Sequence, residues 1–182
     1  MLENKLTGNW KFRQLGTDKF YKAEVPGDVT IDYYKNGLIE DPYTGMHYVD
    51  SKWILDEDFE YVNEFELDKS CFDYEKINLY LKGVDTYSDV FVNGEYVGKT
   101  ENMFIEYKFD IKKFANKGKN ELKIILHSTL KKMETFDVKD YFATFNVPRL
   151  FVRKAQCHFG WDWAPNLPGY GIWQEVYVRA EI

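Results

Sequence analysis

Apolar residues recur at every second position in several parts of this chain, and this period limits the folds that it can adopt. The stretch 77–82 reads Ile-Asn-Leu-Tyr-Leu-Lys, in which apolar and more polar side chains alternate. Such alternation is typical of a half-buried strand, because successive side chains of a strand point to opposite faces. Further strands are expected over 107–111 and 121–127, and a last one over 173–182, with clear alternation from Val176 onward.

One dipeptide predicts a tight chain reversal. Asn93-Gly94 separates the β-prone segments 90–92 and 95–97. The favoured two-residue hairpin turn needs positive φ at both central positions, and Asn and Gly tolerate this conformation better than other residues. The polar stretch 116–120 predicts a second turn, just before the strand that begins at residue 121.

Helical signals are few. Asp28 fits the N-cap of a short helix that runs to Asn36, with Gly37 just past its end, and another turn or two is expected within 133–142. Strands do not alternate with helices, so the pattern predicts an all-β fold, an antiparallel β-sandwich with one or two short helices. The 182 residues fit one domain, or at most two very small ones.

Composition narrows the class of protein. Hydrophobic residues make up 45% of the chain, enough for a core, and the formal net charge is −6. A nucleic-acid or anionic-membrane partner is not expected, because such surfaces are bound by clustered Lys and Arg. The amino terminus has no apolar signal core, and the chain has no long apolar run, so a cytoplasmic protein is expected. Reduced thiols are the simpler interpretation of Cys71 and Cys157, although a disulfide stays open.

The segment 133–168 has little strand pattern, and long irregular connections often carry function. Within it, Trp161 and Trp163 flank Asp162 on a loop bounded by Gly and Pro. A Trp ring suits the apolar C–H face of a sugar, while a carboxylate accepts hydrogen bonds from two neighbouring hydroxyls. The alternative is that both Trp belong to the core and that Asp162 pairs with Arg153 or Lys154.

Other residue types give no catalytic, metal or cofactor signature. Cys157 and His158 are adjacent, and neighbouring residues seldom reach one metal ion together. His47 and His127 are isolated in the sequence and are expected to be structural or solvated. No Gly-rich phosphate loop is present, so neither a metal nor a cofactor is expected.

Eight segments together resemble, in order and over nearly the whole chain, the N-terminal region of β-mannosidases of the β-galactosidase/β-glucuronidase clan, glycoside hydrolase family 2. The Trp-Asp-Trp loop is the most specific of them. The segments are Leu-Thr-Gly-Asn-Trp-Lys-Phe (6–12), Ala-Glu-Val-Pro-Gly (23–27), Asn-Gly-Leu-Ile-Glu-Asp-Pro-Tyr (36–43), Leu-Lys-Gly-Val-Asp-Thr (81–86), Val-Asn-Gly (92–94), Asn-Met-Phe (102–104), 153–165 and Gly-Ile-Trp (171–173).

This resemblance implies a single jelly-roll-like sandwich of the galactose-binding type over residues 1–182. In the family, immunoglobulin-like domains and a (β/α)₈ barrel follow, and the barrel holds the two catalytic Glu residues of a retaining mechanism. The resemblance therefore implies that this chain contains no catalytic residue, is inactive alone, and packs on a catalytic domain that it lacks.

The same resemblance assigns roles to the loop. Trp161, Asp162 and Trp163 would line the subsite for a terminal β-mannoside, and Arg153 and Gln156 would support them. One position departs from the family, because Ala164 stands where Gly is usual. If that position needs positive φ, Ala costs about 1 kcal/mol.

Three alternatives stay open at this point. The chain could be a free-standing carbohydrate-binding module, because this fold serves many functions. It could be a purely structural sandwich that packs against a barrel. Within the enzyme reading, the same domain of a β-galactosidase or β-glucuronidase is the runner-up.

Overall fold

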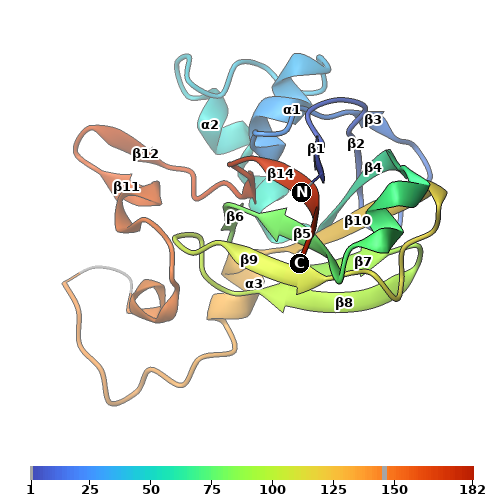
Figure 1. Ribbon diagram of the computed structural model, residues 1–182. Helices are drawn as coiled ribbons and strands as arrows, with labels where there is room; N and C mark the ends of the chain where they lie inside the picture. Colours follow the sequence, from blue (N-terminus) through green and yellow to red (C-terminus); the bar gives the residue numbers. More distant parts are fainter. Residues whose placement is uncertain (1, 145–146) are drawn as a thin grey trace.

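A computed structural model describes residues 2–144 and 147–182, and two antiparallel sheets form its body (Figure 1). The larger sheet has six strands, in the order β3 (Tyr21–Lys22), β2 (Lys11–Gln14), β4 (Phe59–Leu67), β10 (Gly118–His127), β7 (Tyr87–Val92) and β8 (Glu95–Thr100). The smaller has four, in the order β1 (Leu2–Lys5), β14 (Val176–Glu181), β5 (Lys76–Leu81) and β9 (Tyr107–Asp110). The predicted all-β antiparallel sandwich is confirmed.

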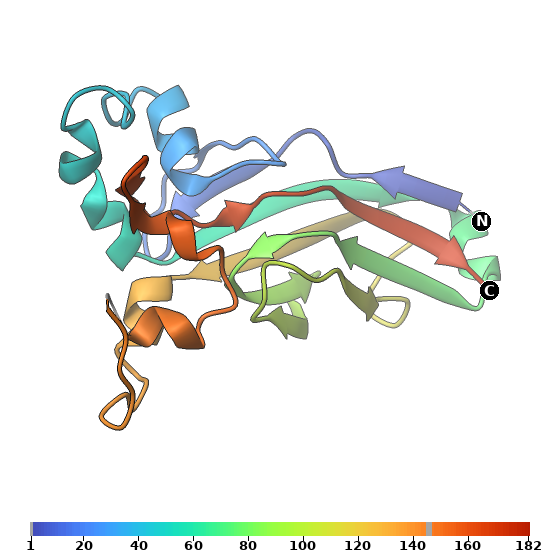
Figure 2. The same cartoon turned by 90° about the vertical axis from the view of Figure 1, so that its left-hand side faces the viewer.

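Two short strand pairs and the helical turns complete the fold. The pairs are β6 (Val84–Asp85) with β13 (Gly171–Ile172), and β11 (Phe159–Trp161) with β12 (Ala164–Asn166). The helical elements are α1 (Val29–Lys35), α2 (His47–Asp50), α3 (Thr129–Met133), η1 (Lys52–Asp56), η2 (Lys69–Asp73), η3 (Pro148–Phe151) and η4 (Gln156–His158). In Figure 2, α1, α2, α3 and the irregular segments after α3 lie at the end of the sandwich opposite the two termini. Among the described residues, no helix is long and apolar enough to span a membrane.

Aromatic side chains fill the core between the larger sheet and α1. Phe12 stacks on Tyr61 with ring centroids 5.5 Å apart, and it meets Tyr33 edge-on at 5.3 Å. The hydroxyl of Tyr61 donates to Asp32 Oδ2 at 2.7 Å, so the polar end of this buried ring is satisfied. Burial raises the pKa of Asp32 to about 6. These contacts fasten α1 to the sheet.

The expected hairpin turn is confirmed at Asn93 and Gly94, which have φ of 52° and 84°. The turn joins β7 to β8, and the side chain of Asn93 ties it to neighbouring segments. Its amide donates to Asn120 Oδ1 and to Phe114 O, both at 2.8 Å, and its oxygen accepts from the backbone N–H of Glu121 at 2.9 Å. This Asn therefore supplies both the turn conformation and the contacts between strands.

The predicted position of one helix is confirmed, and that of the other is wrong. Asp28 caps α1 by accepting from the backbone N–H of Thr30 at 2.8 Å. The helix expected within 133–142 instead lies at 129–133 as α3, because Ser128 accepts from the backbone N–H of Lys131 at 3.1 Å and so starts the helix earlier. This cap residue follows directly on β10, where the sequence pattern indicated only a strand.

Strand β5 is confirmed, but its expected half-burial is wrong. Its outward residues Asn78 and Tyr80 are also buried, because side chains of the neighbouring strands β14 and β9 flank them. Tyr80 stacks on Tyr177 at 4.7 Å between ring centroids, and both Asn78 and Tyr80 donate to Glu181, at 2.7 and 2.6 Å. Cross-strand pairs of this kind stabilise a sheet even on its outer face.

His127 is structural, as expected, because it joins three strand regions at the edge of the core. Its Nδ1 lies 3.0 Å from Asp58 Oδ2, and its Nε2 lies 2.9 Å from Asp89 Oδ2. The hydrogen bond with Asp58 raises the pKa of His127 above its ordinary 6.5, and the same bond lowers the pKa of Asp58. Protonated His127 thus bridges two carboxylates.

We expect this bridge to make stability depend on pH. Because the folded-state pKa of His127 is raised, its contribution is fully present below about pH 6.5 and is lost as pH rises through the folded-state pKa. His127→Gln should therefore lower the free energy of unfolding by about 1 kcal/mol or less near pH 6, given solvent screening of a partly exposed group. Urea unfolding at about pH 6 and about pH 9 measures the difference, which should shrink at the higher pH. A difference that stays constant would contradict this account.

Candidate functional site

The Trp-Asp-Trp segment forms the tip of the β11–β12 hairpin, which extends away from the sandwich (Figure 1). Trp161 pairs with Ala164 across the hairpin, so Asp162 and Trp163 make the two-residue turn. Trp161 is 51% exposed and Trp163 is 71% exposed. The alternative that both Trp belong to the core is therefore wrong, and the hairpin presents two indole rings at the surface.

Asp162 is exposed between the two rings. Within 2–144 and 147–182, no side-chain hydrogen bond or ion pair of Asp162 is found, so the expected alternative of a pair with Arg153 or Lys154 is wrong. Lys154 is buried and binds Asp85 instead. The oxygens of Asp162 can therefore accept hydrogen bonds from an outside partner.

In the part of the chain that the structure describes, no hydrogen bond joins Arg153 or Gln156 to the tip. Arg153 is exposed, and its backbone carbonyl accepts from the N–H of Met103 at 3.0 Å. The amide of Gln156 donates to the carbonyl oxygens of Arg149 at 3.0 Å and Lys154 at 3.3 Å. Both residues therefore act on the chain that enters the hairpin, and Gln156 does so through its side chain.

The family-typical Gly is not needed at Ala164. Among the described residues, positive φ outside glycine occurs at Asn9 and Asn93, so Ala164 is unstrained in β12. The left-handed position is Gly160 instead, with φ of 99°. A Cβ at Gly160 would also lie 3.1 Å from the Cβ of Asn166, on the partner strand. The shape of the hairpin therefore depends on Gly160.

A buried polar cluster beneath the hairpin was not anticipated from the sequence. Asp85 binds the ammonium group of Lys154 and the hydroxyl of Thr86, and its Oδ2 lies 3.6 Å from His158 Nδ1. Burial raises the pKa of Asp85, but the nearby His158 and the charge and hydrogen bond of Lys154 outweigh burial and hold the pKa below its ordinary value. The carboxylate is therefore charged at neutral pH. Lys154 and His158 are far from Asp85 in sequence, so spacing gave no signal for this cluster.

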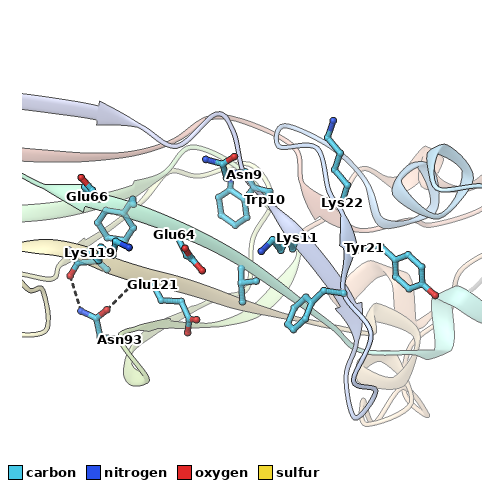
Figure 3. A pocket seen from close by; sticks show the side chains of 14 residues that line it. Asn9, Trp10, Lys11, Tyr21, Lys22, Glu64, Glu66, Asn93, Lys119 and Glu121 are labelled. Atoms are coloured by element: carbon cyan, nitrogen blue, oxygen red, sulfur yellow. Dashed lines mark hydrogen bonds between the residues drawn. The ribbon is translucent and has the colours of Figure 1, made fainter.

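A second candidate surface is a groove on the outer face of the larger sheet, with a volume of about 1070 Å³ (Figure 3). Its walls carry positively charged lysines and negatively charged glutamates from β2, β3, β4 and β10: Lys11, Lys22, Glu64, Glu66, Lys119 and Glu121. Trp10 and Phe65 in its lining are buried, and a cation covers each of the other two rings. Arg13 lies 4.4 Å above Phe20, and Lys19 lies 4.7 Å above Tyr21.

These differences favour the hairpin as a sugar site. A sugar ring needs an open aromatic face beside a hydrogen-bonding group, which is what Trp163 and Asp162 offer. The groove instead presents the alternating charges of a solvated sheet face. Charged side chains of this kind on a sheet surface are usually solvated.

Further exposed apolar side chains lie on the segments around the hairpin end of the sandwich (Figure 2). They come from the region of α2 and η1, from the segment after α3 and from η3: Tyr43, Met46, Val49, Trp53, Tyr141, Phe142, Leu150 and Phe151. Exposed apolar side chains that gather in this way typically mark a contact surface for another protein or domain.

Comparison with known proteins gives a consistent result. The family described as glycosyl hydrolase 2 galactose-binding domain-like matches residues 10–174. The β-mannosidase of Mus musculus is 32% identical over 188 residues, which cover 96% of this chain and 21% of that protein. The β-mannosidase of Capra hircus is 33% identical, again over 96% of this chain and 21% of the relative. The chain thus spans about a fifth of the length of these relatives.

Solved structures that resemble this chain include two glycosidases of one organism. The β-D-mannosidase from Dictyoglomus thermophilum matches with a TM-score of 0.94 and 39% identity, over 99% of this chain and 23% of that one. The β-D-glucuronidase from the same organism matches with a TM-score of 0.62 and 19% identity, over 97% of this chain and 27% of that one. At this low identity, the second match shows a shared fold only.

Two substitutions test the backbone of the hairpin. Gly160→Ala should reduce the hydrogen-exchange protection of the hairpin amides about tenfold, because Ala is strained at positive φ. Ala164→Gly should reduce it only about twofold to fivefold, because Gly gains freedom in an open strand. Native-state hydrogen exchange measures both. Increased protection in Ala164→Gly would mean that Ala164 is strained after all.

Proposed function

Because the chain belongs to the glycosyl hydrolase 2 galactose-binding domain-like family, we propose that it is the N-terminal domain of a β-mannosidase-like glycoside hydrolase. The curated relatives that support this are β-mannosidases about five times as long as the aligned region. In this proposal the domain supplies a hairpin to the sugar site, and the rest of the parent supplies the catalytic groups.

The exposed Trp-Asp-Trp tip is the observation that carries the proposal. Trp161 and Trp163 offer flat apolar surface for the C–H face of a terminal mannose. Asp162 lies between them with its carboxylate uncommitted within the described chain, and it accepts from two neighbouring hydroxyls. A site that binds the terminal sugar of a saccharide in this way suits an exo-acting enzyme.

The hairpin binds sugar but does not cleave it. A retaining glycosidase needs two carboxyl groups about 5–5.5 Å apart, one as nucleophile and one as acid/base. Residues 159–166 contain a single acidic residue, Asp162. The catalytic pair of the proposed parent therefore lies outside the hairpin, and the resemblance implies that a barrel domain holds it.

The exposed apolar end of the sandwich fits the same proposal. Its segments lie at the same end of the sandwich as the hairpin, so a catalytic domain that packs there would bring its carboxylates to the sugar held by Asp162. A free-standing carbohydrate-binding module is the competing function. The isolated hairpin, however, offers only one wall of a site, and such a half-site is expected to bind weakly, because most of a ligand's surface stays in water.

Asp162→Ala tests the role of the carboxylate in a protein that contains this chain and its catalytic domain. The kcat/KM for an aryl β-mannoside should fall about a hundredfold or more, because hydrogen bonds to a charged group are lost. The melting temperature should stay unchanged, because Asp162 supports no internal contact of the described chain.

Glu64→Ala is the matched control, an exposed carboxylate in the groove of the larger sheet. It should leave both kcat/KM and melting temperature unchanged. Loss of folded protein in Asp162→Ala would favour a structural role for the hairpin, and full activity would contradict the proposal.

The division of the site between domains predicts where activity resides. We expect this chain alone to hydrolyse none of a panel of aryl β-glycosides, while the longer protein hydrolyses the β-mannoside. Preference for the β-galactoside or β-glucuronide would shift the assignment to the runner-up enzymes. Tight binding of mannose by this chain alone, measured by calorimetry, would favour the binding module instead.

A further inference from the structure

Lys154 is buried at the base of the hairpin, and its side chain is 0% exposed. Its ammonium group donates to Asp85 Oδ2 and, at 2.6 Å, to the carbonyl oxygen of Gly169. Buried lysines are rare, and a buried ion pair often adds little to stability. A contribution to stability therefore does not by itself explain why this ion pair is buried at the base of the hairpin.

The two contacts of Lys154 join three parts of the chain. Lys154 precedes β11, and Gly169 follows β12, so their hydrogen bond closes the base of the segment that carries the hairpin. Asp85 belongs to β6, which pairs with β13 in the sandwich. One ammonium group therefore links the incoming stem, the outgoing stem and the body of the domain.

The outgoing stem is itself held firmly. The backbone at Gly169 packs on the carboxylate of Asp28, where an added Cβ would lie 2.4 Å from Oδ2. The next residue, Tyr170, accepts from the N–H of Val29 at 3.0 Å. Because Asp28 also caps α1, the acceptor of the Lys154 hydrogen bond is fixed to the helix and through it to the core.

The hairpin has little intrinsic stability. Its two strands share the pairs Phe159 with Asn166 and Trp161 with Ala164, and an isolated two-stranded hairpin is marginal in water. Phe159 packs on Met133 and Val152 at one side of the base. The direction in which the tip points must therefore come from its attachments.

We propose that Lys154 is a positioning residue, whose buried ammonium group, joined to Asp85 and Gly169, sets the orientation of the Trp161-Asp162-Trp163 tip relative to the sandwich. The consequence for turnover rests on the proposed function, whereas the consequence for the hairpin does not. Misplacement of a binding group by about 1 Å can reduce turnover about a hundredfold.

The test uses the double variant Lys154→Met with Asp85→Asn. It removes both charges of this pair, so neither partner is left charged without the other, and it also removes the donor to Gly169. Nitrogen-15 relaxation of this chain gives backbone order parameters for 159–166. We expect values of about 0.85 in the wild type and below about 0.6 in the variant, with the sheets unchanged.

The matched control is Lys82→Met with Glu175→Gln, which removes a surface ion pair of 2.9 Å between the end of β5 and the start of β14. It should change no order parameter in 159–166. The proposal is overturned if the hairpin of the double variant keeps its wild-type order, or if the wild-type hairpin is already disordered. It is also overturned if the double variant does not fold, because the pair would then serve the whole domain.

Activity of the longer protein separates the two proposals. In the double variant, kcat/KM for an aryl β-mannoside should fall about a hundredfold, with the melting temperature retained. A disordered hairpin with full activity would leave the positioning role intact and contradict the proposed sugar site. An ordered hairpin with reduced activity would contradict the positioning role alone.

Discussion

The burial of large aromatic rings between the six-stranded sheet and the elements packed on it is the constraint on which the rest of this structure depends. Phe12, Phe59 and Tyr61 come from neighbouring strands, and Tyr33 comes from α1. Each aromatic side chain buries a large apolar area, so these rings supply much of the apolar driving force for folding. Because Tyr33 takes part, α1 is placed by the same packing that holds the sheet together.

Positions further along the chain follow from that placement. Asp28 caps α1 and supports the backbone at Gly169, and Gly169 accepts from Lys154 at the base of the hairpin. A series of hydrogen bonds and contacts thus connects the well-packed core to the exposed tip of the hairpin. Functional groups carried on loops need such rigid support, because the loop itself contributes little apolar burial.

Buried polar groups occur where elements of different layers meet. Asp32 accepts from Tyr61 between α1 and β4, and Asp85 pairs with Lys154 beneath the hairpin. Both of these carboxylates accept hydrogen bonds, and an unpaired buried polar atom in either place would cost about as much as several favourable contacts contribute. These pairs lie at joints between elements, where direction matters more than contact area. Apolar packing cannot fix direction as closely, because it is not directional.

The sequence by itself determined the features that depend on neighbouring residues. Asn93-Gly94 specified its turn, Asp28 its helix cap, and the period of two its strands, because φ preferences and side-chain alternation act over a few residues. Tertiary structure alone decided the rest. It buried Asn78 between the neighbouring strands β14 and β9, gave Lys154 a partner 69 residues away, and left Trp163 exposed on the tip of a hairpin. Whether a side chain is buried or paired depends on residues that are distant in the sequence and fold against it. Local sequence spacing does not reveal those residues.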